Sequence, residues 1–337
     1  MIYVHVPFCR SFCIYCGFYS EIACSGRFAG AVRAYADGVV EEIGRRRGEI
    51  ACTAGTNTLY IGGGTPSVLP LDVLGRIVKA LGPAEYEEFT IEVNPDDVTG
   101  LGRGYLEGLR SLGVNRVSMG VQSLDDGILR WMNRRHDADG AAKAFRMLRD
   151  AGFDNVSLDL IFGVNGLSDT MLLSTLELLK DWRPEHVSAY QLSVEEDSAL
   201  AGMIAGGRYQ ELDDESCRRQ YDMICSFLRS AGYDHYEISN WSLPGFRARH
   251  NSAYWTRAPY VGLGPGAHSL RIDGDVQVRS WNSNVLSGWT SSSEVLTDEE
   301  IREERLMLGL RTSSGVDGMA IPESSWFVAD DIISGMI

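Results

Sequence analysis

The chain begins Met1-Ile-Tyr-Val-His-Val-Pro-Phe-Cys-Arg-Ser-Phe-Cys-Ile-Tyr-Cys-Gly-Phe18, an apolar strand-like run followed by three cysteines in the spacing Cys-x-x-x-Cys-x-x-Cys. Thiolates are soft ligands that select iron–sulfur clusters or zinc, and a cluster of four irons takes four ligands. Cys9, Cys13 and Cys16 therefore predict a 4Fe-4S cluster with one iron left open. There are two alternatives. One is a zinc ion, with His5 as its fourth ligand, that would only fix the N-terminal segment in place. The other is three buried cysteines without metal.

Length and composition limit the classes of protein to which this chain can belong. The 337 residues suit one large α/β domain, or one domain with an appendage. The 31 Lys and Arg against 46 Asp and Glu give a formal charge of −15, which repels phosphate, so we expect no nucleic-acid partner.

No apolar run approaches the ~20 residues of a membrane-spanning helix, and a strand stands where a signal peptide would, so we expect a cytoplasmic protein. In that reducing compartment we expect the remaining cysteines to be structural, namely Cys24, Cys52, Cys217 and Cys225.

Short apolar, β-branched runs alternate with helical patterns, which predicts successive βα units around a parallel sheet, either open or rolled into a partial barrel. The expected strands are Tyr3–Val6, Thr58–Ile61, Thr90–Val93, Arg116–Val121, Val156–Ile161 and Val187–Leu192. The expected helices are 32–47, 71–81, 103–112, 140–151, 170–182, 213–230 and 298–309. The alternation stops after Gly232, so we place a core domain at 1–235 and a smaller C-terminal region at 236–337. The run Arg45-Arg46-Arg47 is interpreted as the solvated end of a helix.

Polar or glycine-rich motifs follow several of the expected strands, where ligands gather in parallel α/β folds. Each is ordinary alone, because a glycine triplet is more often a turn than a site, and a lone acid usually marks the solvent face of a strand. The motifs are Gly62-Gly-Gly-Thr-Pro66, Glu92 in the third strand, Gln122 at the end of the fourth, Asn133-Arg134 in an expected helix, and Asp159 in the fifth strand.

The cysteine loop, with Tyr15 just before its third cysteine, resembles that of the radical S-adenosylmethionine (SAM) superfamily, and the motifs after the strands match it in order. The resemblance implies an incomplete barrel of six βα units, with SAM chelating the open iron and cleaved by a reduced cluster to a 5′-deoxyadenosyl radical. The implied SAM contacts are Gly63, Gly64 and Thr65 to the amino group, Glu92 and Asp159 to the ribose and methionyl parts, and Gln122 and Arg134 to the ribose and carboxylate. Tyr3 would pack near the cluster. The flanking residues Phe8, Phe12, Ile14 and Phe18 would shield it from solvent, which lowers its potential.

The string Arg249-His-Asn-Ser-Ala-Tyr-Trp255 carries a different chemistry. Histidine is a standard axial ligand of heme iron, and Tyr and Trp supply flat faces for a macrocycle, although one histidine beside two aromatics is more often a packing element. The string resembles the His-Asn-x-x-Tyr-Trp motif of the HemW-type heme chaperones, which implies that His250 carries heme.

Two features distinguish these chaperones from oxygen-independent coproporphyrinogen III oxidase, a radical SAM enzyme of porphyrin biosynthesis and the alternative interpretation. The oxidase has a fourth cysteine where this chain has Phe18, and an extension ahead of its cysteine loop where this chain has eight residues. The resemblance therefore implies a chaperone rather than an enzyme. It would pass heme to acceptor proteins such as respiratory membrane enzymes, work with an electron donor, and act as a homodimer or at the inner membrane face. Relatives continue beyond the equivalent of Asp317, so we expect a shortened C-terminal domain.

Overall fold

The central sheet contains all six predicted parallel strands, and the α/β class is confirmed. The computed structural model describes residues 1–22, 28–53 and 55–337. The parallel strands are β1 (Ile2–Val6), β4 (Thr58–Gly63), β5 (Glu88–Val93), β6 (Arg116–Gln122), β7 (Val156–Phe162) and β8 (His186–Gln191), adjacent in that order. These strands are apolar and β-branched because most of their residues are buried, as expected for a parallel sheet covered on both faces.

Strands from the C-terminal part of the chain extend this sheet at both ends. At one end β11 (Val261–Leu263) pairs in parallel with β1. At the other end β10 (Asn240–Ser242) pairs antiparallel with β8, and β9 (Asp234–Glu237) pairs with β10. A separate antiparallel sheet comprises β12 (His268–Asp273), β13 (Val276–Asn282) and β14 (Ser291–Val295), and β2 (Phe8–Cys9) pairs with β3 (Glu21–Ile22). The domain boundary near 235 stays a prediction, with sheet partners on both sides of it.

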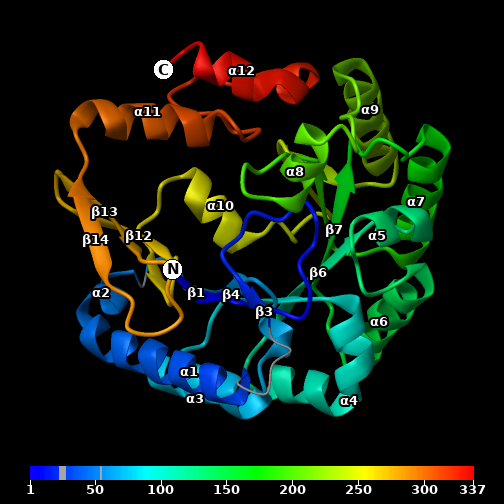
Figure 1. Cartoon of the computed structure of the whole chain (residues 1–337). Helices are drawn as coiled ribbons and strands as arrows, with labels where there is room; N and C mark the ends of the chain where they lie inside the picture. Colours follow the sequence, from blue (N-terminus) through cyan, green and yellow to red (C-terminus); the bar gives the residue numbers. More distant parts are fainter. Residues whose placement is uncertain (23–27, 54) are drawn as a thin grey trace.

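The longer helices form an arc around the outer side of the sheet (Figure 1). They are α1 (Phe28–Arg45), α3 (Leu71–Leu81), α4 (Pro95–Ser111), α6 (Ala138–Asp150), α7 (Asp169–Trp182) and α9 (Asp214–Ser230), with α11 (Asp298–Gly309) further along the chain. Shorter helices escaped prediction because six or seven residues show too little periodicity: α2 (Arg47–Cys52), α5 (Asp126–Trp131), α8 (Ala199–Ala205), α10 (Arg249–Trp255), α12 (Ala329–Ser334) and the 3-10 segments η1 (Pro66–Val68) and η2 (Glu323–Val328). No helix in the described ranges is both long and apolar enough to cross a membrane.

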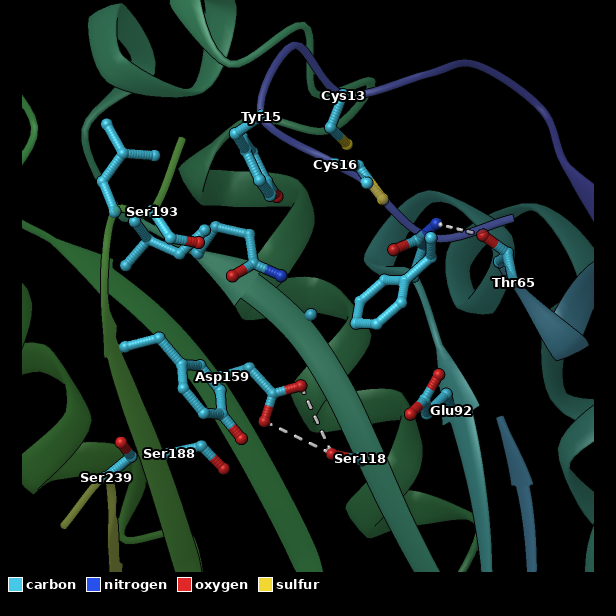
Figure 2. Close-up of a pocket in the computed structure, with 18 of the residues that line it drawn as sticks. Cys13, Tyr15, Cys16, Thr65, Glu92, Ser118, Asp159, Ser188, Ser193 and Ser239 are labelled. Carbon is cyan, nitrogen blue, oxygen red and sulfur yellow. Dashed lines mark hydrogen bonds between the residues drawn. The ribbon is translucent and has the colours of Figure 1, made fainter. Parts of the chain in front are cut away.

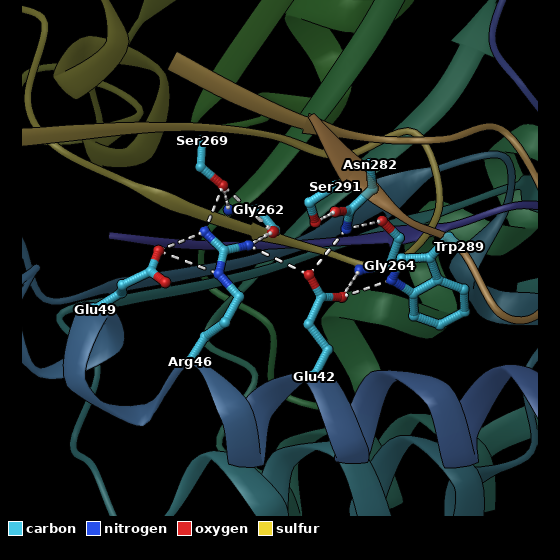
Figure 3. Close-up of polar contacts among 9 residues, drawn as sticks. All are labelled: Glu42, Arg46, Glu49, Gly262, Gly264, Ser269, Asn282, Trp289 and Ser291. Carbon is cyan, nitrogen blue, oxygen red and sulfur yellow. Dashed lines mark hydrogen bonds and ion pairs between the residues drawn. The ribbon is translucent and has the colours of Figure 1, made fainter. Parts of the chain in front are cut away.

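A buried polar network joins α1 to the C-terminal strands (Figure 3). The Glu42 carboxylate, 1% exposed, accepts hydrogen bonds from Gly264 N (2.9 Å), Asn282 Nδ2 (2.9 Å) and Trp289 Nε1 (3.0 Å). Arg46 pairs with Glu42 and donates to the Gly262 carbonyl oxygen at 2.8 Å. The expectation that 45–47 is a solvated helix end is therefore wrong at Arg46, whose charge is needed to pair with the buried carboxylate. The network holds β11 beside β1.

The cysteines outside the N-terminal loop have different environments. Cys217 is buried in α9 and Cys225 is partly buried there, which agrees with a packing role. Cys52 is exposed at the end of α2, so it contributes nothing to the core. Cys24 lies outside the described residues.

Candidate functional site

A cavity of about 850 Å³ lies at the carboxyl ends of the parallel strands, below the cysteine loop. In Figure 2, Tyr15, Cys13 and Cys16 lie on one side of this space, with Asp159, Ser118 and Ser188 on the opposite side. The structure brings together in its lining most of the predicted site residues, namely Cys9, Cys13, Cys16, Tyr15, Gly63, Gly64, Thr65, Glu92, Gln122, Arg134 and Asp159. Tyr3 and His250 are outside it.

Strand β6 shows how the fold places polar side chains in this cavity. Side chains of a strand alternate between its two faces. Arg116, Ser118, Gly120 and Gln122 line the cavity, whereas the apolar residues between them are buried in the core. The period-two alternation of β6 therefore separates a ligand-facing row from a core-facing row.

The three cysteines are partly buried around the mouth of the cavity, and two of their sulfurs accept hydrogen bonds. Arg134 Nη1 lies 3.3 Å from Cys13 Sγ, and Thr65 Oγ1 lies 3.5 Å from Cys9 Sγ. Burial raises the pKa of Cys9 and of Cys16, and the neighbouring thiols add to the effect. A bound metal would reverse this effect, because a coordinating thiol is deprotonated.

The arrangement of donors fits a cluster better than a zinc ion. Both ring nitrogens of His5 have protein partners, since Nδ1 lies 3.0 Å from Tyr3 Oη and Nε2 lies 3.1 Å from the Tyr19 carbonyl oxygen. His5 is therefore not placed to complete a zinc site. In the part of the chain that the structure describes, no group of three or more His, Cys, Asp and Glu side chains is arranged to hold a metal ion. Cluster ligands need no such convergence on one point, because each thiolate binds a different iron.

The aromatic flanks of the loop differ in burial. Phe8 is buried, packed edge-on against Tyr35, but Phe12 is 49% exposed and Phe18 is 71% exposed. Phe12 and Phe18 nevertheless both line the cavity, so the shielding of the cluster by these residues stays a prediction.

Arg134 is held toward the cysteine loop by a turn, not by a helix as predicted. It follows α5, and Asn133 before it adopts a positive φ of 60°. The Asn133 side chain donates to the Phe12 carbonyl oxygen at 2.7 Å, and Arg134 Nη2 donates to Asn94 Oδ1 at 2.7 Å. This turn directs a buried guanidinium to the sulfur of Cys13.

Glu92 is fixed from two sides beneath the glycine segment. It accepts hydrogen bonds from Tyr60 Oη at 2.7 Å and from the Gly63 backbone N–H at 3.0 Å. Burial, with a contribution from Asp159, raises the pKa of Glu92 to about 7. Gly63 has a φ of 114°, and a Cβ on Gly64 would lie 2.6 Å from the Phe8 carbonyl oxygen. Glycine is therefore required here by positive φ and by the close passage of the cysteine-bearing segment.

Asp159 is the second, partly buried carboxylate of the cavity. Ser118 Oγ lies 3.3 Å from both of its carboxylate oxygens. Dashed lines mark these two contacts in Figure 2. Burial raises its pKa, although the nearby serines and arginines oppose the effect. The carboxylates of Glu92 on β5 and Asp159 on β7 thus line the cavity on either side of β6, each with hydrogen-bond donors of its own.

Tyr3 and His250 lie behind the cavity wall. Tyr3 packs against Tyr60 with ring centroids 6.1 Å apart. His250 is 1% exposed, with Nδ1 2.9 Å from Thr58 Oγ1 and Nε2 3.3 Å from Tyr254 Oη. Burial lowers the pKa of His250 to about 3. The predicted heme ligand is therefore neutral and fully engaged within the protein in this conformation, while Asn251 beside it lines the cavity.

Several lining residues escaped prediction. Ser118 and Arg116 could have been found from the alternation along 116–122, which leaves both on the face opposite to Val117. Ser188 and Ser239 carry no motif. The tail contributes Trp326, Phe327 and Asp330, and no signal in its sequence predicts contact with the site.

Comparisons with known proteins identify the family. Residues 3–179 match the radical SAM superfamily. The chain is 33% identical over 322 residues to the heme chaperone HemW of Lactococcus lactis subsp. lactis (strain IL1403), covering 93% of this chain and 82% of that protein. It is 31% identical over 328 residues to the heme chaperone HemW of Bacillus subtilis (strain 168), covering 93% and 84%. Among solved structures, the chain superposes on coproporphyrinogen III oxidase (HemN) from Escherichia coli, a radical SAM enzyme, with a TM-score of 0.75 at 21% identity. The superposition covers 92% of this chain and 75% of that chain, so the two share the fold. The chain belongs to the radical SAM superfamily and, within it, to the family of the heme chaperone HemW.

Proposed function

We propose that this protein is a heme chaperone that holds a 4Fe-4S cluster, binds SAM, and transfers heme to acceptor proteins. The observation that carries the proposal is the convergence of Cys9, Cys13 and Cys16 with the predicted SAM residues on one cavity, in a chain whose relatives include heme chaperones. The same proposal has further parts. The heme acceptors would include respiratory membrane enzymes, and an electron donor would take part. The protein would work as a homodimer at the cytoplasmic side of the inner membrane.

The three cysteines would hold the cluster, which when bound supplies single-electron reduction of SAM. The chain's own groups would then position SAM. Arg134, whose guanidinium already donates to Asn94, can donate two parallel hydrogen bonds to the SAM carboxylate. Glu92 has a pKa near neutrality, so it can accept a hydrogen bond from a ribose hydroxyl or donate one. Exposed Phe12 and Phe18 stand beside the cluster loop, where an electron donor would approach.

Heme binding is proposed to use His250, which must first leave Thr58 and Tyr254. The backbone N–H groups of Arg249 and His250 donate to the Glu88 carboxylate at 2.7 and 3.0 Å, which holds the start of the seven-residue α10, so the imidazole itself must turn away from its two partners. His268 offers a matched comparison, because it is the exposed histidine of β12 and stacks on Trp281 at 6.3 Å. His250→Ala should abolish heme absorbance bands in an anaerobic titration of reconstituted protein, and His268→Ala should keep them. Equal heme binding by wild type and His250→Ala would refute the assignment of the ligand.

The alternative function, oxidative decarboxylation of a porphyrinogen, is tested in the same preparation. With dithionite, SAM and coproporphyrinogen III under anaerobic conditions, a chaperone forms no vinyl product. Vinyl product together with 5′-deoxyadenosine would instead establish the oxidase activity. Phe18, in the position of the oxidase's fourth cysteine, leads us to expect no product.

A further inference from the structure

A second feature of the cavity, distinct from the cysteine loop, is the arginine at its floor. Arg116 is the first residue of β6 and Gln122 is the last, and both line the cavity. A strand rises roughly 3.3 Å per residue, so the six steps between them separate their backbones by about 20 Å. Arg116 therefore marks the end of the cavity away from the cluster loop.

The guanidinium of Arg116 has few protein partners. The side chain is among the largest fully buried ones, yet its one hydrogen bond among the described residues is a long contact of 3.4 Å from Nη1 to Thr90 Oγ1. Nε is buried without a partner. In the described part of the chain no carboxylate oxygen lies within 4.0 Å of this guanidinium, unlike that of buried Arg257, which pairs with Glu304 at 2.7 Å.

The nearby acids do not satisfy this cation. Glu92 and Asp159 are close enough for the charge of Arg116 to lower their pKa, but that effect is outweighed by burial. Glu92 uses its oxygens for Tyr60 and Gly63, and Asp159 uses its oxygens for Ser118. A buried charge without a hydrogen-bonded partner is costly. An anionic group from outside the protein would remove that cost.

The surroundings suit a carboxylate. The guanidinium is a planar fork that matches the two oxygens of a carboxylate. Hydroxyls of Ser118, Ser188 and Ser239 line the same part of the cavity (Figure 2). We propose that the floor of the cavity is a carboxylate-binding subsite anchored by the unpaired guanidinium of Arg116. The carboxylate has two possible sources, a small free acid or a propionate arm of heme, and the second source rests on the proposed function.

The first arm of the test uses sodium propionate as the probe, against sodium chloride at equal ionic strength. Propionate at ten times its Kd should raise the Tm of the wild type by about 2 °C. Arg116→Gln should lose this rise and Arg116→Lys should keep part of it. Arg257→Gln removes an arginine that is also buried but is paired and lies outside the cavity, so it should keep the full rise whatever its own Tm. Circular dichroism checks that each variant is folded.

The second arm uses hemin and hemin dimethyl ester in optical titrations. If a propionate arm reaches the floor, wild type should bind hemin about tenfold more tightly than the ester, and Arg116→Gln should bind the two alike. Either positive arm supports the subsite and names its source. If folded Arg116→Gln matches wild type in both arms while hemin still binds, the subsite is wrong and the chaperone function stands. If wild type responds to propionate but binds neither porphyrin, the subsite stands and the proposed function fails.

Discussion

His250 Nδ1 lies 2.9 Å from Thr58 Oγ1, so the histidine that the sequence assigns to heme is anchored to the first residue of β4. Its Nε2 contacts Tyr254 Oη, and the imidazole packs 5.1 Å from the ring of Tyr60. Coordination of heme iron by this residue therefore requires it to leave a buried site.

This anchoring predicts slow, gated heme binding. The observed rate in stopped-flow absorption should reach a plateau as heme concentration rises, because release of His250 limits it. Thr58→Val removes the hydroxyl and keeps the volume, so the plateau rate should increase by roughly tenfold, the equivalent of one net hydrogen bond. Thr175→Val is the matched control, a similarly buried threonine on α7 away from the cavity, and should leave the rate unchanged. A rate linear in heme and insensitive to Thr58 would contradict gating at this contact.

The partly buried carboxylate of Glu92 predicts a pH dependence of stability. Its pKa is raised from 4.5 to about 7 in the folded protein, so the folded state binds the proton more tightly than the unfolded state. Its contribution to stability is therefore complete below pH ~4.5 and is lost as pH rises through about 7. Glu92→Gln should remove this loss and become more stable relative to wild type, by at most about 3 kcal/mol, between pH 5 and 8.

Urea unfolding at several pH values measures this difference. His250, with its lowered pKa, acts in the opposite direction below pH 6.5, so the difference between variant and wild type is the informative quantity. Glu237→Gln serves as comparison, because Glu237 is also buried with a pKa raised to about 7 but is not part of the cavity lining. A constant difference between Glu92→Gln and wild type across this range would show that Glu92 is not protonated in the fold.

Arg134 is predicted to determine SAM affinity. Charge-assisted hydrogen bonds contribute ~1.5–3 kcal/mol, so Arg134→Leu should weaken SAM binding by roughly tenfold to a hundredfold in anaerobic calorimetry. Arg130→Leu is the control, since Arg130 is an exposed residue of α5 that does not line the cavity. Equal SAM affinity of the two variants would remove Arg134 from the SAM site.

Gly64 is predicted to be indispensable for the position of the cysteine loop. An alanine Cβ there would lie 2.6 Å from the carbonyl oxygen of Phe8, the residue before Cys9, and backbone atoms must shift to accommodate it. Gly64→Ala should reduce iron content after reconstitution and lower stability by about 1–3 kcal/mol. Gly100→Ala in α4, where a Cβ meets no atom within 4 Å, should retain full iron content. Full iron in Gly64→Ala would show that the loop adapts.

The sequence predicted the six parallel strands well because buried strands must be continuous apolar runs, and it singled out the cysteine loop because three cysteines at that spacing stand out in the sequence. It could not predict that His250 points inward, because that depends on Thr58 and Tyr60 from a strand distant in sequence. Arg116 was counted only as the start of a strand, since its lack of partners is a property of the folded protein. The sequence also could not predict that the C-terminal tail lines the cavity. Trp326 and Phe327 belong to a short 3-10 segment, which has no recognisable sequence pattern.

The central claim is that Cys9, Cys13 and Cys16 leave one iron of a cluster available to SAM. Electron paramagnetic resonance of the anaerobically reconstituted, dithionite-reduced protein, recorded with and without SAM, tests it most directly. We predict a reduced 4Fe-4S signal whose g values change when SAM is added, and whose intensity is lost when all three cysteines are replaced by alanine. A signal that SAM leaves unchanged, or a colourless preparation loaded with zinc, would contradict the account.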